Sequence, residues 1–439
     1  MVEALSKAHS MKAFEPRGPL RGTARIPGDK SISHRALMLT ALAVGESRID
    51  GLSDGGDVSA TVDALRAMGA QIRRDRAGCT VEGVGVGGLL QPEKPFALGN
   101  SGTSARLLMG LIASHPIRAI FTGDPSLSRR PMERIAKPLR SIGARFDTAP
   151  GGRLPLTVEG IYPALPRRHA LEIPSAQLKS ALLLAGLNLP GTTIVEAPPS
   201  RDHLERLLPL FGARLEIADR ELRLRGEAEL HPTCLSVAGD PSAAAFLVVA
   251  ALIVPGSAIR IDNVCVNPHR TGLFEMLVAM GADLRFSGTK MISGEPVADL
   301  EARHSSLKGV DVPPELAPRM IDEFPILFVA AAFAEGRTRT RGLAELRIKE
   351  SDRLAGMAAG LLAIGVRVEE HEDGLDVEGT AGEPISGGAT IASLLDHRIA
   401  MSFAVAGLHS VEPVGIDDMR PIDTSFPGFL HALEALTRP

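Results

Sequence analysis

The chain has 439 residues, 44% of them hydrophobic and 23% charged, and a formal net charge of −4 at pH 7, a composition typical of a soluble globular protein. The length exceeds what one hydrophobic core usually supports and predicts two domains. Neither the net charge nor the 3% aromatic content favours binding to nucleic acid or to an anionic membrane, so we expect neither partner.

The cysteines and the apolar runs exclude further classes of protein. Cys79, Cys234 and Cys265 form no CxxC pair and have no histidine at ligand spacing, which argues against a zinc site or a disulfide framework. The opening stretch 1–14 lacks the apolar core of a signal peptide, and runs such as 243–254 are shorter than the roughly 18 residues of a membrane span. We expect a cytoplasmic protein without a metal ion.

A short polar stretch followed by a long apolar run occurs six times. A helix that is apolar all round must be buried, so its polar start is the part free to meet a ligand. After each run come glycine or proline and a β-branched stretch, which predicts buried helix, turn and strand. The six polar starts are Ser31–Arg35, Ser101–Ser104, Ser175–Lys179, Asp240–Ser242, Ile321–Glu323 and Asp396–Arg398.

A second sequence pattern also recurs. It predicts an amphipathic helix that ends in apolar–Gly–apolar and leads into a strand. Glycine fits the left-handed position just after a helix, where a side chain would be strained. The repeat of about 70 to 80 residues is longer than that of solenoids and predicts a closed arrangement of a few large units. The glycines are Gly69, Gly143, Gly212, Gly281 and Gly365.

Six units in two domains give three units per domain. Polar starts abut strands near 26–28 and near 238–240, which are natural domain boundaries. We therefore expect one domain over 27–238, and a discontinuous one over 1–26 plus 239–439. Two ordinary α/β domains without a special site remain the alternative.

The first candidate ligand site is the stretch 27–35. A phosphate-binding Walker loop needs lysine directly after glycine, and Asp29 intervenes, so that hypothesis fails. Lys30 and Ser31 at a helix start, with Arg35 one turn later, would suit a phosphate or carboxylate. The alternative is a solvated charge cluster.

Two further polar segments give weaker evidence for a ligand site. The glycines and small hydroxyls of 99–103 would let a ligand approach the backbone closely at Gly102. Arg129 and Arg130 precede Pro131, which is a favourable first residue of a helix. A solvent-facing arginine pair is an equally good interpretation.

The segment 347–353 carries five charges in seven residues. If it opens the following helix, Lys349 and Arg353 stand four apart as a two-cation clamp, with Glu350 beside them as a candidate proton carrier. The alternative is a plain charged helical face.

Acidic residues open two other helices. Asp322 could be only an N-cap, and Asp396 with Arg398 could be a cap and a surface cation. Together these segments contain seven cations and the two carboxylates of Asp322 and Glu350. This set predicts a substrate with several anionic groups. It also predicts a reaction by proton transfer with electrostatic stabilisation, without a cofactor. The cations are Lys30, Arg35, Arg130, Lys179, Lys349, Arg353 and Arg398.

With these motifs in this order, the sequence resembles the 5-enolpyruvylshikimate-3-phosphate synthases from Leu20 to about Phe429. The resemblance implies an α/β fold of two domains, each of three βαβαββ units with buried helices, an inside-out α/β barrel with the active site in the interdomain cleft. The motifs are Pro27–Arg35, Gly99–Thr103, Ser175–Gln177, Lys349–Arg353 and Asp396–Arg398.

The resemblance implies transfer of the enolpyruvyl group of phosphoenolpyruvate to the 5-hydroxyl of shikimate 3-phosphate, with release of phosphate. Asp322 would be the base for the hydroxyl, Glu350 the acid for the methylene carbon, and Lys30, which would touch both substrates, the third catalytic residue. Shikimate 3-phosphate would be bound by Lys30, Ser31, Arg35, Ser175, Ala176, Gln177, Arg201, Asp322 and Lys349. Phosphoenolpyruvate would be bound by Lys30, Gly102, Arg130, Gln177, Arg353 and Arg398.

The sequence departs from the common family pattern at two places. Thr424 stands where many members have a lysine, and Ala176 where many have a second serine. Gly102 is retained, although herbicide-tolerant members tend to have alanine there, so glyphosate is predicted to fit beside it.

The chain is expected to be a monomer. Two alternative functions stay open. The sister transferase acting on UDP-N-acetylglucosamine has the same fold, but its reactive cysteine has no counterpart in 122–130. A non-catalytic anion-binding protein would not need Asp322 and Glu350 among the cations.

Overall fold

The computed structural model describes residues 11–75, 78–171, 173–196 and 199–437. By its contacts the chain divides into two compact units. Unit 1 comprises residues up to 27 together with 239–290 and 296–439, and unit 2 comprises 28–238 and 291–295. The division predicted from the sequence placed Pro27 and 291–295 on the other side. The N-terminal stretch 1–10, which carried the signal-peptide argument, lies outside the described residues.

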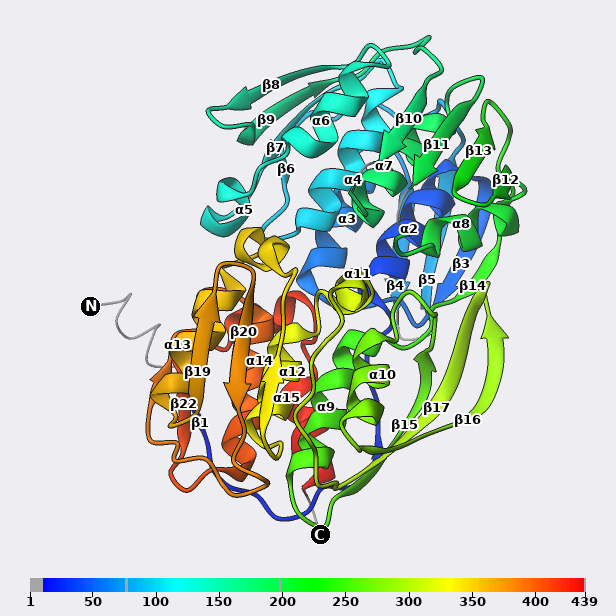
Figure 1. The fold of residues 1–439 in the computed structure, drawn as a ribbon. Coiled ribbons are helices and arrows are strands. Elements are labelled where there is room, and N and C mark those ends of the chain that lie inside the picture. The colour runs from blue at the N-terminus through cyan, green and yellow to red at the C-terminus, as the bar shows by residue number, and fades with distance from the viewer. Residues whose placement is uncertain (1–10, 76–77, 172, 197–198, 438–439) are drawn as a thin grey trace. The chain divides into compact units, whose positions relative to one another are not determined.

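Unit 2 contains three four-stranded sheets among its described residues, drawn from blue to green in Figure 1. The first has the order β14-β3-β5-β4, with β3 (Val44–Asp50), β4 (Gln71–Asp75), β5 (Gly78–Val84) and β14 (Cys234–Ser236). The second has the order β6-β7-β9-β8, with β6 (Phe96–Ala97), β7 (Arg118–Thr122), β8 (Arg145–Ala149) and β9 (Arg153–Glu159). The third has the order β10-β11-β13-β12, with β10 (Arg168–Leu171), β11 (Thr192–Glu196), β12 (Arg214–Ala218) and β13 (Glu221–Arg225).

The helices of unit 2 alternate between buried and peripheral ones. The buried helices are α2 (Lys30–Leu42), α4 (Gly102–Ala113) and α7 (Ala176–Gly186). The others are α3 (Gly56–Ala67), α5 (Pro125–Arg129), α6 (Glu133–Arg140), α8 (His203–Leu207) and the 3₁₀ turn η1 (Leu208–Phe211).

Unit 1 also contains three sheets among its described residues. Their orders are β1-β22-β21, β16-β17-β15-β2 and β18-β20-β19. The strands are β1 (Lys12–Phe14), β2 (Arg21–Ala24), β15 (Ala258–Cys265), β16 (Asp283–Ile292), β17 (Glu295–Arg303), β18 (Arg337–Arg339), β19 (Arg367–His371), β20 (Gly374–Glu378), β21 (Thr390–Ile391) and β22 (Val414–Ile416).

The helices of unit 1 follow the same alternation. The three in the core are α9 (Pro241–Ile253), α12 (Phe324–Ala332) and α14 (His397–Ala406). The others are α10 (Gly272–Ala279), α11 (Ala317–Met320), α13 (Arg353–Ala363), α15 (Phe429–Leu436) and the 3₁₀ turns η2 (Pro314–Leu316), η3 (Ala344–Ile348), η4 (Gly407–His409) and η5 (Arg420–Thr424).

One pairing pattern recurs in the sheets and confirms the repeats predicted from the sequence. In each four-stranded sheet of unit 2, one parallel pair is followed by antiparallel pairs: β14 with β3, β6 with β7, and β10 with β11 are the parallel ones. Unit 1 has the same parallel contact between β2 and β15 and between β21 and β22.

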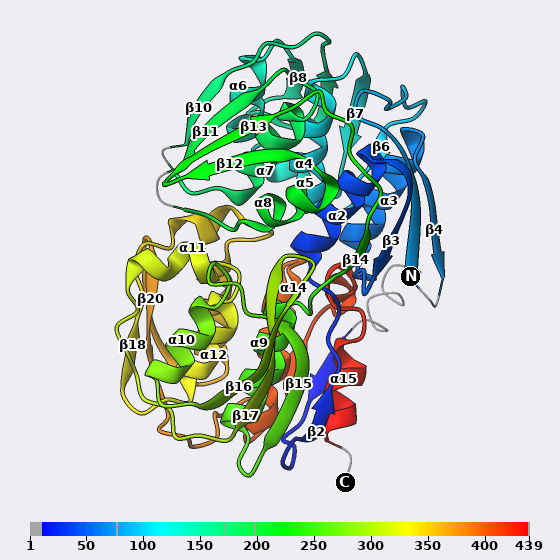
Figure 2. The ribbon, with the colours of Figure 1, turned by 90° about the vertical axis from the view of Figure 1, so that its right-hand side faces the viewer.

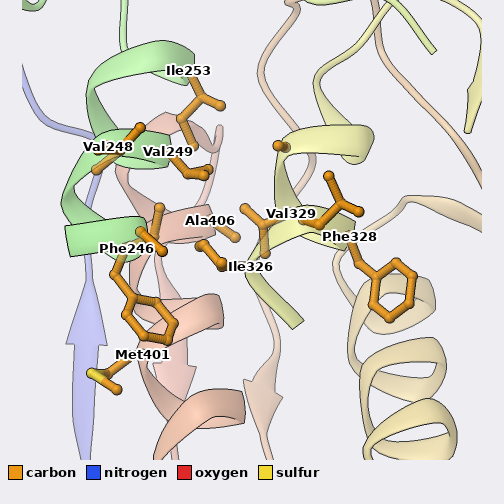
Figure 3. Close-up of a cluster of buried hydrophobic side chains, with 14 of the residues drawn as sticks. Phe246, Val248, Val249, Ile253, Ile326, Phe328, Val329, Met401 and Ala406 are labelled. Atoms are coloured by element: carbon orange, nitrogen blue, oxygen red, sulfur yellow. The ribbon is translucent and has the colours of Figure 1, made fainter. Parts of the chain in front are cut away.

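The predicted buried helices are confirmed as the core of unit 1. All thirteen residues of α9, all nine of α12 and all ten of α14 are buried. These helices pack on one another, and Figure 3 shows Phe246 and Val249 of α9, Val329 of α12 and Ala406 of α14 in their contact. Burying each large apolar side chain is worth about 1.5–3 kcal/mol, so these helices are fixed in place and hold their polar starts steady.

The recurring glycines adopt the conformation predicted for them. Gly69, Gly143, Gly212, Gly281 and Gly365 all have positive φ, between 80° and 110°. Each follows a helix or a 3₁₀ turn, where a residue with a side chain would be strained.

None of the helices in the described part of the chain is both long and apolar enough to cross a membrane. The cysteines are free thiols: Cys79 and Cys265 are buried, and Cys234 is exposed.

Candidate active site

The start of α2 presents Lys30 as predicted. Asp29 caps the helix, since its carboxylate accepts a hydrogen bond from the backbone N–H of Ile32 at 2.8 Å. The Lys30 ammonium forms an ion pair with Asp57 of α3, with 2.9 Å between Nζ and Oδ2. Asp57 was missed by the sequence analysis because it lies in a different helix.

Arg35 is buried, so it does not belong to a solvated charge cluster. Its guanidinium donates to the backbone oxygen of Ser31 at 2.9 Å and to the Ser180 hydroxyl of α7 at 2.8 Å. It also donates to the backbone oxygen of Ala176 at 3.4 Å. Arg35 thus brings the start of α2 and the start of α7 together.

Gly102 is the first residue of α4, and two arginines lie against it. A Cβ atom at Gly102 would come within 2.8 Å of an Arg130 nitrogen and 3.1 Å of an Arg106 nitrogen. Arg106 also donates to the side-chain oxygen of Gln177 at 2.9 Å, and the Gln177 amide donates to Thr103 at 3.1 Å. Arg106 was not predicted, although a lone arginine in an apolar helix, one turn after Gly102, was a usable signal.

The helix expected to begin at Pro131 does not begin there. Arg130 is the C-cap of α5, and α6 begins only at Glu133. Arg130 is buried rather than solvent-facing, and it donates to Asn100 and to the Ser126 hydroxyl, the latter at 3.1 Å.

Three further residues of unit 2 that the sequence singled out have different roles in the structure. Ser175 caps α7 by accepting from Leu178, and Arg201 lies partly exposed in the segment before α8. Lys179, counted above as a ligand-facing cation, is only 1% exposed and forms an ion pair of 2.6 Å with Glu205. That expectation is wrong, because Lys179 and its partner are both buried, whereas the Lys30 side chain, also paired with a carboxylate, stays partly exposed. Burial raises the pKa of Glu205, and Lys179 opposes this shift.

Arg353 is the centre of the predicted residues in unit 1. It is the first residue of α13, is fully buried, and its guanidinium contacts three carboxylates. Nε lies 2.8 Å from Asp396, and the other nitrogens lie 3.4 Å from Asp322 and 2.5 Å from Glu350. Burial alone would lower the pKa of Arg353, but these three carboxylates raise it above the ordinary value.

The two-cation clamp on one helical face was predicted incorrectly. Lys349 follows η3, and Asp352 caps α13 by accepting from the N–H of Ala355 at 3.0 Å, so the helix begins after Lys349. Burial lowers the pKa of the Lys349 ammonium, while Asp322 and Glu345 act in the opposite direction. Lys349 therefore still interacts electrostatically with the same carboxylate as Arg353.

Arg398, which could have been a surface cation, is only 6% exposed. It donates to the backbone oxygen of Asp322 at 2.9 Å, and the same nitrogen lies 3.8 Å from the Glu323 carboxylate. Asp396 caps α14 as predicted, accepting from the N–H of Arg398 at 2.9 Å. Asp322 contacts Arg353 and Arg398, which a simple helix cap would not do.

These contacts define two clusters. The unit 2 cluster consists of Lys30, Arg35, Gly102, Arg106, Arg130 and Gln177. The unit 1 cluster consists of Asp322, Lys349, Glu350, Arg353, Asp396 and Arg398. The first offers cations and an amide to an anion. The second adds carboxylates that can exchange protons.

One group of side chains in the described residues has the spacing of a metal site: Glu369, His371 and Asp376. Its Asp376 carboxylate, however, already lies 2.6 Å from Arg341 and 3.6 Å from Arg337. Arginine supplies the positive charge that a metal ion would bring, so this group carries no metal-site assignment.

Comparison with known proteins gives a single answer. The family described as EPSP synthase (3-phosphoshikimate 1-carboxyvinyltransferase) matches residues 14–433. A 3-phosphoshikimate 1-carboxyvinyltransferase of Sphingopyxis alaskensis is 59% identical over 436 residues, covering 97% of this chain and 98% of the relative. The one from Zymomonas mobilis is 59% identical over 420 residues, covering 94% and 93%.

Solved structures agree with these relatives. An EPSP synthase from Acinetobacter baumannii superimposes with a TM-score of 0.86 at 41% identity, covering 97% of this chain and 98% of that one. The enolpyruvyl transferase NikO from Streptomyces tendae has the same fold, with a TM-score of 0.77 at 19% identity.

Proposed function

This chain belongs to the EPSP synthase family, and we propose that it transfers the enolpyruvyl group of phosphoenolpyruvate to the 5-hydroxyl of shikimate 3-phosphate, releasing phosphate. The observation that carries the proposal is the arrangement around Arg353. One buried guanidinium holds Asp322 and Glu350, the two carboxylates that the reaction needs. Full-length relatives of this name at 59% identity support it.

The proposal assigns side chains of both clusters to the substrates. Phosphoenolpyruvate would be bound by Lys30, Gly102, Arg130, Gln177, Arg353 and Arg398. Shikimate 3-phosphate would be bound by Lys30, Ser31, Arg35, Ser175, Ala176, Gln177, Arg201, Asp322 and Lys349. Of these, Arg35 is supported mainly as the residue that positions Ser31 and Ala176, because its guanidinium already donates to both backbones.

The proposed reaction is an addition followed by an elimination. The 5-hydroxyl oxygen bonds to C2 of phosphoenolpyruvate while Asp322 accepts the hydroxyl proton and Glu350 donates a proton to C3. Loss of a proton from the new methyl group then restores the double bond as the C2–O bond to phosphate breaks. The cations stabilise the charge that develops on the departing phosphate.

Glu350 can serve as an acid only if it holds a proton when the substrates are bound. An anionic substrate at Arg353 would compete with Glu350 for the same guanidinium and place a negative charge nearby, which favours the protonated carboxyl. Substrate binding would thereby prepare the acid.

The competing functions have less support. Transfer to UDP-N-acetylglucosamine is not what the relatives at 59% identity are named for. A purely anion-binding protein would have no use for two carboxylates on the arginine that binds the anion.

Location and oligomeric state complete the proposal. The three free thiols, one of them exposed, suit a reducing compartment, so we propose a cytoplasmic enzyme. We also propose that it acts as a monomer.

The test is phosphate release from phosphoenolpyruvate with shikimate 3-phosphate, with UDP-N-acetylglucosamine, and with no acceptor. Release that depends on shikimate 3-phosphate supports the proposal. Release without an acceptor, or only with the UDP-sugar, contradicts it.

A further inference from the structure

A cavity of about 670 Å³ on unit 2 is lined by five arginines and lies apart from the residues assigned above. It opens on the sheet β10-β11-β13-β12, which is labelled in Figure 2. We call it the arginine cavity and define it by Arg167, Arg168, Arg214, Arg223 and Arg225. Glu216 is the one acidic residue in its lining.

The central feature of the arginine cavity is a pair of like charges in register. Arg214 of β12 and Arg225 of β13 are directly opposite each other on antiparallel strands, so their side chains lie on the same face. Like charges in this position destabilise a sheet. No ion pair joins either arginine to a carboxylate of the described residues.

The other arginines of the cavity are held by neighbouring groups. Arg223 and Arg168 both contact the Glu221 carboxylate, at 2.6 and 3.4 Å. Arg167 donates to the backbone oxygen of Ser141 at 3.0 Å, which fixes its side chain but leaves its charge in place.

We propose that the arginine cavity binds a small molecule with two or more adjacent phosphate groups. Guanidinium groups bind phosphate through paired hydrogen bonds, and an anion between Arg214 and Arg225 would turn their repulsion into attraction. The cavity is open and its five arginines are exposed, so the ligand would be held mainly by charge. A nucleic acid fits less well, because no aromatic side chain lines the cavity to stack on a base.

Calorimetric titration of the full-length protein with pyrophosphate, at low ionic strength, tests this proposal. In the double variant Arg214→Ala/Arg225→Ala we expect binding at least about tenfold weaker. The control is Arg220→Ala, which removes an exposed arginine of the turn between β12 and β13 that does not line the cavity. It should bind pyrophosphate like the wild type, and all three proteins should catalyse the proposed reaction equally.

Equal affinity in the wild type and the double variant would overturn the proposal, as would the absence of binding. In that case Arg168 of β10 and Arg214 of β12 serve only to protect the two edge strands of the sheet. Binding of a single-stranded oligonucleotide but not of pyrophosphate would also overturn it.

A second inference concerns the polar start Asp240–Ser242, which the proposed reaction leaves without a role. Asp240 caps α9 as expected, and it also contacts Arg270 at 3.3 Å. Arg270 donates to the Ser242 hydroxyl at 2.9 Å, and Ser242 donates to the Glu323 carboxylate. All four residues are buried.

Glu323 connects this network to Arg398. Its Oε1 receives the Ser242 hydrogen bond and lies 3.8 Å from the Arg398 guanidinium. Its Oε2 is buried and accepts no hydrogen bond from any described residue. A buried carboxylate that is only half satisfied is costly unless a cation is near, and Arg398 is such a cation.

We infer that Glu323, held by Ser242, is a positioning residue for Arg398. This inference rests on the proposed function, in which Arg398 binds phosphoenolpyruvate. Asp240–Ser242 then acts through Glu323, although it does not contact the substrate.

The test compares Ser242→Ala with Ser402→Ala in steady-state kinetics. Ser402 is a matched control, since it is a buried serine of α14, one turn after Arg398, whose hydroxyl has no hydrogen-bond partner in the described residues. Ser242→Ala loses one hydrogen bond to a charged group, so the KM for phosphoenolpyruvate should rise about tenfold. The KM for shikimate 3-phosphate should stay within about twofold of the wild-type value. Glu323→Asp should also change the KM for phosphoenolpyruvate. Ser402→Ala should change neither KM.

A melting temperature lowered in Ser242→Ala with both KM values unchanged would mean a merely structural role and would overturn the inference. Failure of the proposed function is a separate result, because the wild type would then show no turnover dependent on shikimate 3-phosphate.

Discussion

The two clusters hold their arginines by different kinds of partner. In the unit 2 cluster, Arg35, Arg106 and Arg130 donate to carbonyl, amide and hydroxyl oxygens, which are neutral. In the unit 1 cluster, the guanidinium of Arg353 contacts three carboxylates. A guanidinium that donates to neutral oxygens leaves their protonation unchanged, whereas a guanidinium in contact with three carboxylates also orients them and stabilises their charged form. The comparison indicates that the carboxylates proposed to move protons lie in unit 1, while both units contribute cations proposed to bind the anions.

The largest effect is expected from Arg353→Leu. Removing one member of a buried ionic group leaves the others unpaired, so we expect a loss of about 3–5 kcal/mol in the free energy of unfolding, together with loss of turnover. Chemical denaturation measures the first effect. The control Arg73→Leu breaks an exposed ion pair with Glu46 and should cost at most about 1 kcal/mol. Similar losses in the two variants would contradict the central place given to Arg353.

Glu350→Gln should separate chemistry from binding. The amide keeps the size of the side chain but cannot donate or accept the proton, so kcat should fall about 10²–10⁴-fold. The dissociation constant of shikimate 3-phosphate should stay within a few fold of that of the wild type. If kcat is unchanged, the acid is another group.

Gly102→Ala should affect the unit 2 cluster alone. The added methyl group would lie 2.8 Å from Arg130 and 3.1 Å from Arg106, so the guanidiniums must move. We expect the KM for phosphoenolpyruvate to rise about tenfold, with a smaller change in kcat. Glyphosate, predicted to fit beside Gly102, should inhibit the variant less than the wild type.

Gly18→Ala is the control for this change, since a Cβ atom at Gly18 would meet nothing within 4 Å. Equal glyphosate sensitivity in wild type and Gly102→Ala would remove the assignment of Gly102 to this site.

The smallest effect expected is the pH dependence of shikimate 3-phosphate binding through Lys349. Because burial lowers the pKa of Lys349 below its ordinary value of 10.5, its positive charge is lost at a lower pH than that of an exposed lysine. Affinity for the anion should therefore fall on the alkaline side as Lys349 deprotonates. In Lys349→Arg, which keeps its charge, this fall should move to higher pH. The same pH profile in both proteins would mean that Lys349 does not contact the anion.

The fold was predictable because its signals are local. Fully apolar runs such as 243–254 and glycines such as Gly281 mark buried helices and helix ends without reference to other segments. The error at Lys349 was also local, since Asp352 is the better N-cap and delays the helix by four residues.

The partners of the site residues were not predictable in the same way. Asp57 and Arg106 act on Lys30 and Gln177 across separations of 27 and 71 residues, and only the folded chain brings them together. Lys179 had the same local signal as Lys30, but its buried partner Glu205 could not be identified from the sequence. A polar helix start therefore predicts a site for an anion, and the tertiary partner decides whether a ligand or a carboxylate occupies it.

The Asp322→Asn/Glu350→Gln double variant separates proton transfer by the unit 1 carboxylates from anion binding by the cations of both units. Calorimetry with shikimate 3-phosphate and phosphate-release kinetics on the same preparation give the two quantities needed. We expect binding within a few fold of the wild type and turnover reduced by at least about 10³-fold. Turnover close to that of the wild type, or loss of binding in parallel with turnover, would contradict this separation.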